Sequence, residues 1–202
     1  MLTKKQLSIL SVFKKDIFGS LTFKQIKHQG RQKSNNIVQI ALKEFGKQNL
    51  AEKKMTGNVQ SFSLNLNNNL TLSYLNLINE SEISKSKVPK KILENIQNRL
   101  FKCTEFFILI VFGSYAKNEA TQKSDLDVAV IAESEQTRKN ILPFLETIKR
   151  RETVQIDYHI FTRSEFLEML NEDSENIGKQ IFKSGLIYYG YIPYCNIIKA
   201  KK

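Results

Sequence analysis

The seven consecutive apolar residues 106–112 constrain the fold of this chain more than any other segment. The run is long enough for a strand, and far shorter than the roughly 18 residues that a membrane span needs. A strand that is apolar on both faces belongs inside a covered sheet. Gly113 and Ser114 end the run, and we expect a helix to begin there. The sequence therefore predicts a buried sheet built around this segment.

Two aspartates, Asp125 and Asp127, stand one residue apart directly before a second apolar run. Successive side chains of a strand point to opposite faces, so these two carboxylates share a face. Their mutual repulsion is relieved by a cation, and magnesium takes one or two carboxylates together with substrate phosphates. Because Gly113 has no Cβ, phosphate oxygens could approach the backbone amides that follow it. The stretch predicts a site for a metal-bound nucleotide.

The pattern of glycine and serine, ten residues, then aspartate, any residue and aspartate resembles the signature of the DNA polymerase beta type nucleotidyltransferase superfamily. It is most similar to the small, minimal members. Those proteins carry a third carboxylate on a later strand. Asp157 matches it, because apolar and polar residues alternate over residues 154–160 as in a half-buried strand.

The resemblance implies an α/β domain, the α+β nucleotidyltransferase fold with a small mixed sheet. The implied reaction moves a nucleoside monophosphate from a triphosphate to a hydroxyl group and releases pyrophosphate, with two Mg²⁺ ions, or Mn²⁺, as cofactors. Asp157 would bind the metal nearest the acceptor and help to remove its proton. By resemblance the catalytic and metal-binding residues are Asp125, Asp127 and Asp157, and the triphosphate is held by Gly113, Ser114 and Lys117.

Two nearby residues need separate comment. Asn118 stands where family members frequently have a glycine, but asparagine tolerates left-handed backbone angles, so the turn can be kept. His159 shares the strand face of Asp157. We expect it to be a solvated strand residue, because a neutral imidazole is not a usual magnesium ligand.

The N-terminal part of the chain is strongly basic. Residues 1–86 carry 13 basic and 5 acidic side chains, against 18 and 15 in residues 87–202. Helices are predicted at 4–18, at 22–30 with a capping box of Thr22 and Gln25, and in a third segment with an apolar stripe from Val38 to Phe45. A β-hairpin over 50–55 and 59–67 follows.

Three helices and a hairpin in this order resemble a winged helix-turn-helix domain, over about residues 1–68. The resemblance and the basic charge predict DNA binding, with the third helix in the major groove and the hairpin on phosphates. A protein interaction module with a merely solvated basic face is the alternative. The candidate DNA-binding residues are Arg31, Lys33, Asn36, Gln39, Lys43, Lys47, Lys53 and Lys54.

A polar stretch over residues 79–89 predicts a domain boundary, giving a winged helix domain at 1–85 and a nucleotidyltransferase domain at 86–202. Further helices are predicted at 70–78, from Pro89 to Leu100, and at 135–151, 164–170 and 174–182. The two cysteines, Cys103 and Cys195, have neither zinc-site spacing nor a disulfide pattern. The amphipathic N-terminus is unlike a signal peptide, so we expect a cytoplasmic protein without a membrane partner.

The leading hypothesis is therefore a nucleotidyltransferase that a DNA-binding domain directs to its target. The acceptor is a protein, a nucleic acid or a small molecule. Minimal relatives act as antitoxins that modify RNase toxins of the HEPN type, so such a toxin is one candidate partner beside the nucleoside triphosphate and DNA. The alternative is a transcriptional regulator whose second domain only senses nucleotide. The sequence fixes neither nucleotide nor oligomeric state, and a homodimer is one candidate.

Overall fold

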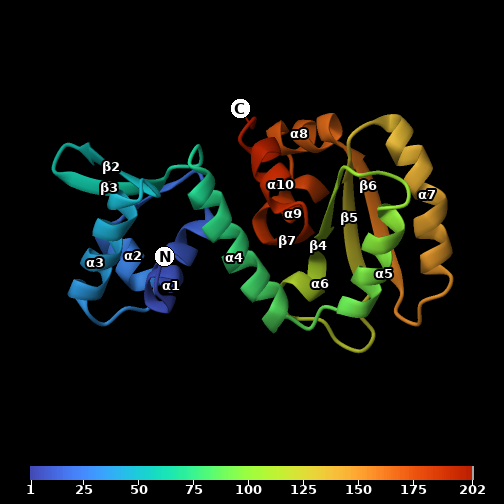
Figure 1. Cartoon of the computed structure of the whole chain (residues 1–202), viewed down its shortest axis with the longest axis horizontal. Coiled ribbons are helices and arrows are strands. Elements are labelled where there is room, and N and C mark those ends of the chain that lie inside the picture. The colour runs from blue at the N-terminus through green and yellow to red at the C-terminus, as the bar shows by residue number, and fades with distance from the viewer. Residues whose placement is uncertain (202) are drawn as a thin grey trace. The chain divides into compact units, whose positions relative to one another are not determined.

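The computed structural model describes residues 1–201 (Figure 1). The chain forms two compact units, Met1–Ile78 and the part from Asn79 onward. The last residue of the domain expected at 86–202 lies outside the described residues. Each unit has its own sheet and is described by itself.

The first unit combines a small helical cluster with a three-stranded antiparallel sheet of order β1-β3-β2. The predicted stripe of the third helix is confirmed, since Val38, Ala41, Leu42 and Phe45 are all buried. The elements of this unit are α1 (Lys4–Leu10), the 3₁₀ helix η1 (Ser11–Lys15), β1 (Ser20–Thr22), α2 (Phe23–Gln29), α3 (Asn35–Lys47), β2 (Ala51–Thr56) and β3 (Val59–Leu64).

Local sequence explains most of these boundaries. The predicted capping box is present at α2, where the Thr22 N–H donates to the Gln25 side chain over 2.8 Å. Gly57 has a φ of 58° in the tight connection between Thr56 and Val59, where a hairpin turn needs a positive φ. One helix prediction was wrong: the segment 4–18 is α1 followed by the tighter η1, which ends at Lys15.

Helix α4 (Asn69–Lys85) extends into the polar stretch 79–89, in which we expected the boundary, and ends at Lys85. The two compact units divide between residues 78 and 79, at the start of that stretch. The polar residues 80–82 are exposed on the helix surface, whereas Asn79 and Ile83 are buried. Part of the polar composition of this stretch therefore belongs to the exposed face of a helix.

The second unit is built on a mixed four-stranded sheet of order β6-β5-β4-β7. Strands β5 and β6 are parallel, and the other pairs are antiparallel. This small mixed sheet agrees with the predicted α/β class. Its elements are α5 (Lys90–Leu100), β4 (Phe107–Val111), α6 (Gly113–Ala116), β5 (Leu126–Ala132), α7 (Glu135–Lys149), β6 (Ile156–Thr162), α8 (Arg163–Asn171), α9 (Ile177–Ser184), β7 (Leu186–Tyr189) and α10 (Tyr191–Ile198).

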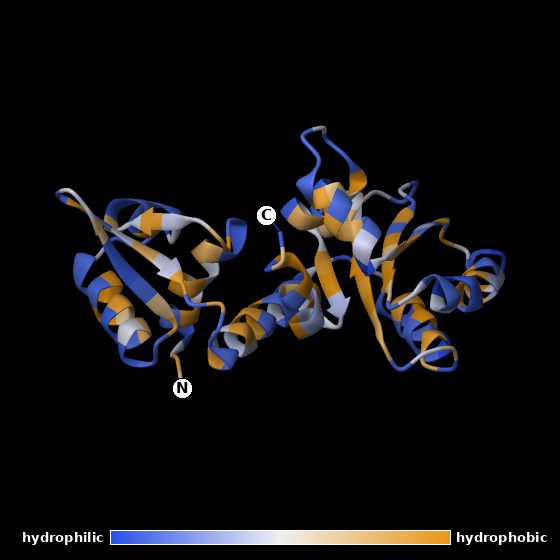
Figure 2. Cartoon of the chain, turned by 90° about the horizontal axis from the view of Figure 1, so that it is seen from above, coloured by the Kyte–Doolittle hydropathy of each residue, from blue (hydrophilic) through white to orange (hydrophobic). Residues whose placement is uncertain are grey.

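The core of this unit lies on both faces of β4 and β5. Every residue of β4 is buried, as the apolar run predicted. Helices α5 and α7 bury Ile96 and Leu145 in one cluster with the strand residues Leu109 and Val128, and α8 and α10 contact the sheet as well. Figure 2 shows the apolar residues concentrated along the strands. Within residues 1–201, no helix is both long and apolar enough to cross a membrane.

One of the two outer strands of this sheet, β7, has a hydrogen-bonding partner on its outer side. The buried side chain of Asn79 pairs with β7 as a strand would: its Nδ2 donates to the Ile187 carbonyl over 2.7 Å, and the Ile187 N–H donates to its Oδ1 over 3.2 Å. A helix side chain thereby satisfies two backbone groups that would otherwise be buried without partners.

We predict that Asn79→Leu lowers the free energy of unfolding of the protein by about 2–4 kcal/mol, because it leaves both backbone groups of Ile187 unpaired in the interior. Denaturant unfolding followed by circular dichroism measures the change. Ser81→Ala, at an exposed position of the same helix, is the matched control and should change stability by less than about 0.5 kcal/mol. Equal stability of the Asn79 variant and this control would contradict the assigned role.

Candidate functional site

Gly113 and Asp127 meet where β4 and β5 lie side by side. The Phe112 N–H donates to the Asp127 carbonyl oxygen over 3.1 Å and brings the end of β4 against β5. Gly113 then has a left-handed φ of 65°, and a Cβ at this position would lie only 1.9 Å from Oδ2 of Asp127. From the sequence, we expected that the missing Cβ of this glycine allows a phosphate to approach the backbone. In the structure, the close approach of the aspartate itself requires it.

The parallel pairing of β5 and β6 brings the second and third aspartates together. Asp127 and Asp157 are direct register partners. Asp125 is exposed at the residue before β5 begins, and the side chain of Asp157 is 53% exposed. The structure thus gathers the three carboxylates at one place in the sheet, near its solvent-exposed margin.

The electrostatic environment acts mainly on Asp127. Burial raises the pKa of this carboxyl, and the negative charges of Asp157 and Asp125 raise it further. Two smaller effects lower the pKa, the charge of His159 and a hydrogen bond from the Ser114 backbone N–H. One backbone amide at the start of α6, that of Ser114, is therefore already hydrogen-bonded to Asp127. Phosphate binding by Gly113, Ser114 and Lys117 stays a prediction.

His159 is the partly solvated strand residue that we expected, with its side chain 36% exposed. It also belongs to this site. Its Nε2 lies 3.4 Å from Oδ2 of Asp157. Its ring stacks on Phe161, with an interplanar angle of 4° and centroids 6.0 Å apart, and its other ring neighbour is Phe112 at 5.9 Å. Two phenylalanine rings therefore lie next to the imidazole, which is beside Asp157. The alternating strand pattern placed the residue on the correct face but could not show these contacts.

The loop after α6 keeps the turn that the sequence analysis considered. Asn118 has a φ of 62°, so asparagine adopts the left-handed conformation at this position. Lys117 is exposed at the end of the helix, and its backbone N–H donates to the Gly113 carbonyl.

The aspartates are suitable ligands for magnesium by chemistry, because hard divalent cations prefer carboxylate oxygens. Burial raises the pKa of Asp127, and the negative charges of Asp157 and Asp125, which a cation would offset, raise it further. Within residues 1–201, however, no group of three or more histidine, cysteine, aspartate or glutamate side chains is already arranged around a metal position. Metal binding by Asp125, Asp127 and Asp157 stays a prediction.

Comparison with protein families bears on this part of the chain. Residues 94–191 match the model of the family described as polymerase beta, nucleotidyltransferase. The match supports the predicted superfamily. It begins in α5 and ends at the first residue of α10, so it contains Gly113 and all three aspartates. Comparison with curated proteins gives no match, and neither does comparison with solved structures. Nucleotidyl transfer is thus the general activity that the comparison supports for this domain.

The candidate DNA-binding residues of the first unit lie on its surface. Every one of the eight side chains named above is exposed. Gln39 and Lys43 of α3 line the same cavity of about 490 Å³ as Lys53 of β2, so the third helix and the hairpin present polar groups side by side. Ile40, on the same helix, is 54% exposed, and the sequence analysis did not single it out. DNA binding stays a prediction.

A further cavity involves residues that the sequence analysis passed over. It lies around β6, and its walls include Arg138 of α7 and Glu168 of α8. Thirty positions separate these two residues in the sequence, and each by itself reads as an ordinary charged residue on a helix surface. Only the packing of both helices near the same strand brings them together.

We predict that Asp127→Asn stabilises the protein at neutral pH. The pKa of Asp127 is higher in the folded chain, so ionisation of this group costs stability as pH rises through the interval above its unfolded value near 4. The amide removes that cost. The melting temperature should rise by about 1–3 °C at pH 7, with the gain shrinking toward pH 4.

Calorimetry at a series of pH values measures this effect. Glu119→Gln removes one negative charge from an exposed position in the same region and serves as the control. A gain of equal size in both variants, or one that grows as pH falls, would contradict the assignment.

Proposed function

We propose that the protein transfers a nucleoside monophosphate from a nucleoside triphosphate to a hydroxyl group of an acceptor. The observation that carries this proposal is the direct pairing of Asp127 with Asp157 beside Gly113, inside the segment that matches the nucleotidyltransferase family. Carboxylates that lie side by side on one face of a sheet repel each other, which costs stability, and nucleotidyl transfer would use this arrangement.

The chemistry assigns one task to each group. The acceptor hydroxyl oxygen attacks the α-phosphorus, a new P–O bond forms, and the bond from that phosphorus to the pyrophosphate oxygen breaks. Asp157 accepts the hydroxyl proton. Its side chain is more exposed than that of Asp127, so an incoming acceptor can reach it. His159, held 3.4 Å from Asp157, keeps that carboxylate oriented. The hydroxyl of Ser114 and the cation of Lys117 contact the phosphates.

Divalent cations bound by Asp125, Asp127 and Asp157 would neutralise the charge that develops on the phosphate oxygens. The raised pKa of Asp127, caused by burial and by the charges of Asp157 and Asp125, is consistent with such a use.

We further propose that the first unit is a winged helix domain that directs the enzyme to DNA. The order α1, β1, α2, α3, β2, β3 supports this, as does the charge of residues 1–78, which include 12 basic and 3 acidic side chains. Helix α3 would enter the major groove with Asn36 and Gln39, and lysines of α3 and β2 would contact phosphates.

The transfer reaction is tested by incubating the full-length protein with each labelled nucleoside triphosphate, Mg²⁺ or Mn²⁺, and candidate acceptors of protein, RNA and small-molecule type. Asp127→Ala and Asp157→Asn should each reduce label transfer by at least about 100-fold, because a positioned acid or base and its partners commonly contribute that much. Glu119→Gln is the control and should retain transfer. Equal labelling by the wild type and both aspartate variants would refute the proposed roles.

DNA binding is tested by fluorescence anisotropy at rising salt concentration. The double variant Lys43→Gln, Lys47→Gln should weaken binding and reduce the slope of log K against log salt by about 2, one unit for each lost phosphate contact. Lys4→Gln, Lys5→Gln makes the same charge change on the exposed part of α1. The same slope for both double variants, or binding that does not depend on salt, would count against contacts from α3.

A further inference from the structure

Within the described residues, the outer edge of β6 has no backbone hydrogen-bonding partner. The order β6-β5-β4-β7 leaves two outer strands, and Asn79 pairs with β7. The Leu126 N–H donates to the Gln155 carbonyl, so alternation turns the backbone groups of Ile156, Tyr158 and Ile160 away from β5. Across the described chain, no backbone hydrogen bond reaches that outer side of β6. An unpaired edge of this kind is a template for another strand.

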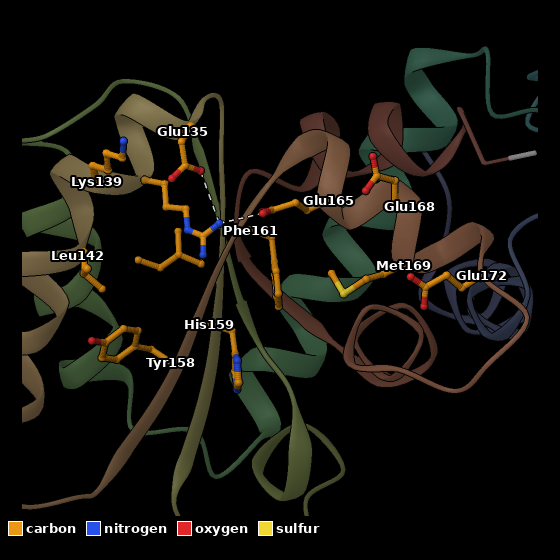
Figure 3. A pocket seen from close by; sticks show the side chains of 12 residues that line it. Glu135, Lys139, Leu142, Tyr158, His159, Phe161, Glu165, Glu168, Met169 and Glu172 are labelled. Carbon is orange, nitrogen blue, oxygen red and sulfur yellow. Dashed lines mark hydrogen bonds and ion pairs between the residues drawn. The ribbon is translucent and has the colours of Figure 1, made fainter.

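A cavity of about 700 Å³ surrounds this edge. One wall is α7 with Leu142, and the opposite wall is α8 with Met169 (Figure 3). Tyr158 and His159 of β6 lie between them, one on each face of the strand. The edge is therefore accessible in a groove that has room for side chains on both faces, which is what an added strand requires.

The groove carries an excess of negative charge. Glutamates outnumber cations among its lining residues, by four to two. Arg138 is already paired, at 2.8 Å from Glu165 and 3.5 Å from Glu135, and these contacts appear as dashed lines in Figure 3. Glu168 and Glu172 form no ion pair within the described residues. A basic segment complements this surface, whereas an acidic one is repelled.

The groove is continuous with the candidate active site through His159. This residue lines the cavity and contacts Asp157 over 3.4 Å. Residues directly opposite each other on neighbouring strands have their Cβ atoms about 4.5–5.5 Å apart on the same face. A serine or threonine on an added strand, opposite Asp157, would thus place its hydroxyl beside that carboxylate.

We propose that β6 binds an extended, basic segment of a protein acceptor by strand addition, and that this presents a hydroxyl of the segment to Asp157. The inference rests on the proposed nucleotidyl transfer and names its acceptor class. The segment's hydroxyl oxygen forms the bond to the α-phosphorus, pyrophosphate leaves, and the proton passes to Asp157. Backbone pairing supplies affinity, and the glutamates of α8 and the residue after it select positive charge.

The test uses the full-length protein and a fluorescent synthetic peptide in which lysine and valine alternate around one serine. Binding is measured by anisotropy without nucleotide, so it does not depend on catalysis. Glu168→Lys, Glu172→Lys should weaken binding at least tenfold. The matched control Glu94→Lys, Glu105→Lys makes the same charge change at exposed positions outside the groove and should leave binding within twofold.

Two further peptides separate strand addition from charge attraction alone. They carry N-methyl groups on alternate amides, one on the odd and one on the even positions. Only one set of amides can face β6, so one peptide should lose binding and the other keep it. Equal binding by both, or equal weakening by both double variants, overturns the proposal. So does a dimer of the wild-type protein that cross-links through β6 and excludes the peptide.

Transfer of label to the peptide serine is then measured with nucleoside triphosphates and Mg²⁺. Labelling that falls with Glu168→Lys, Glu172→Lys supports both docking and transfer. Selective binding without labelling of any acceptor would sink the proposed function and leave the docking site standing. Equal labelling in the wild type and this variant would overturn the docking site and leave the proposed nucleotidyl transfer standing.

Discussion

The approach of the Asp127 carboxylate to Gly113 is the constraint on which the geometry of the second unit's site depends. Any side chain at position 113 would collide with Oδ2 of the aspartate, and the backbone there is left-handed in addition. The same contact fixes the start of α6, because the Ser114 N–H is hydrogen-bonded to that carboxylate. Glycine, serine and aspartate are therefore one structural unit, although ten residues lie between the serine and the first aspartate.

This arrangement is unfavourable for the folded chain taken alone. Asp127 is partly removed from water and faces two other negative charges. The cost is tolerated because the rest of β5, from Val128 to Ala132, is buried and paired on both sides. A rigid strand holds its first residues where isolated side chains would move apart. An unfavourable local free energy that a stable core offsets is typical of sites that bind or transform a ligand.

Much of this could be predicted from the sequence, because it depends on periodicity. The apolar run at 106–112 predicted the strand β4. The alternation of apolar and polar residues at 154–160 predicted that Asp157 and His159 lie on one face of β6. The pairing of Asp127 with Asp157 depends on the parallel register of β5 and β6, and no local sequence pattern predicts that register. The stacking of His159 and the groove along β6 likewise depend on packing between distant segments.

The errors have physical causes of the same kind. The polar stretch at 79–89 did not show that a helix continues into it, and α4 continues because one of its faces is buried through Asn79 and Ile83. The short strand β1 has too few residues to show an alternating pattern, and it exists because Leu21 pairs with Phe62 of β3. Element types that follow from long patterns were predictable, while boundaries and short elements depended on the tertiary context.

The side chain of Asn79 has a consequence for assembly. A sheet with two open edges can grow in both directions, and such growth leads to fibres. Here the amide of Asn79 occupies both backbone groups of Ile187 on β7, and among the described residues the outer side of β6 has no such partner. Strand addition of the kind proposed would therefore be confined to one side of this sheet.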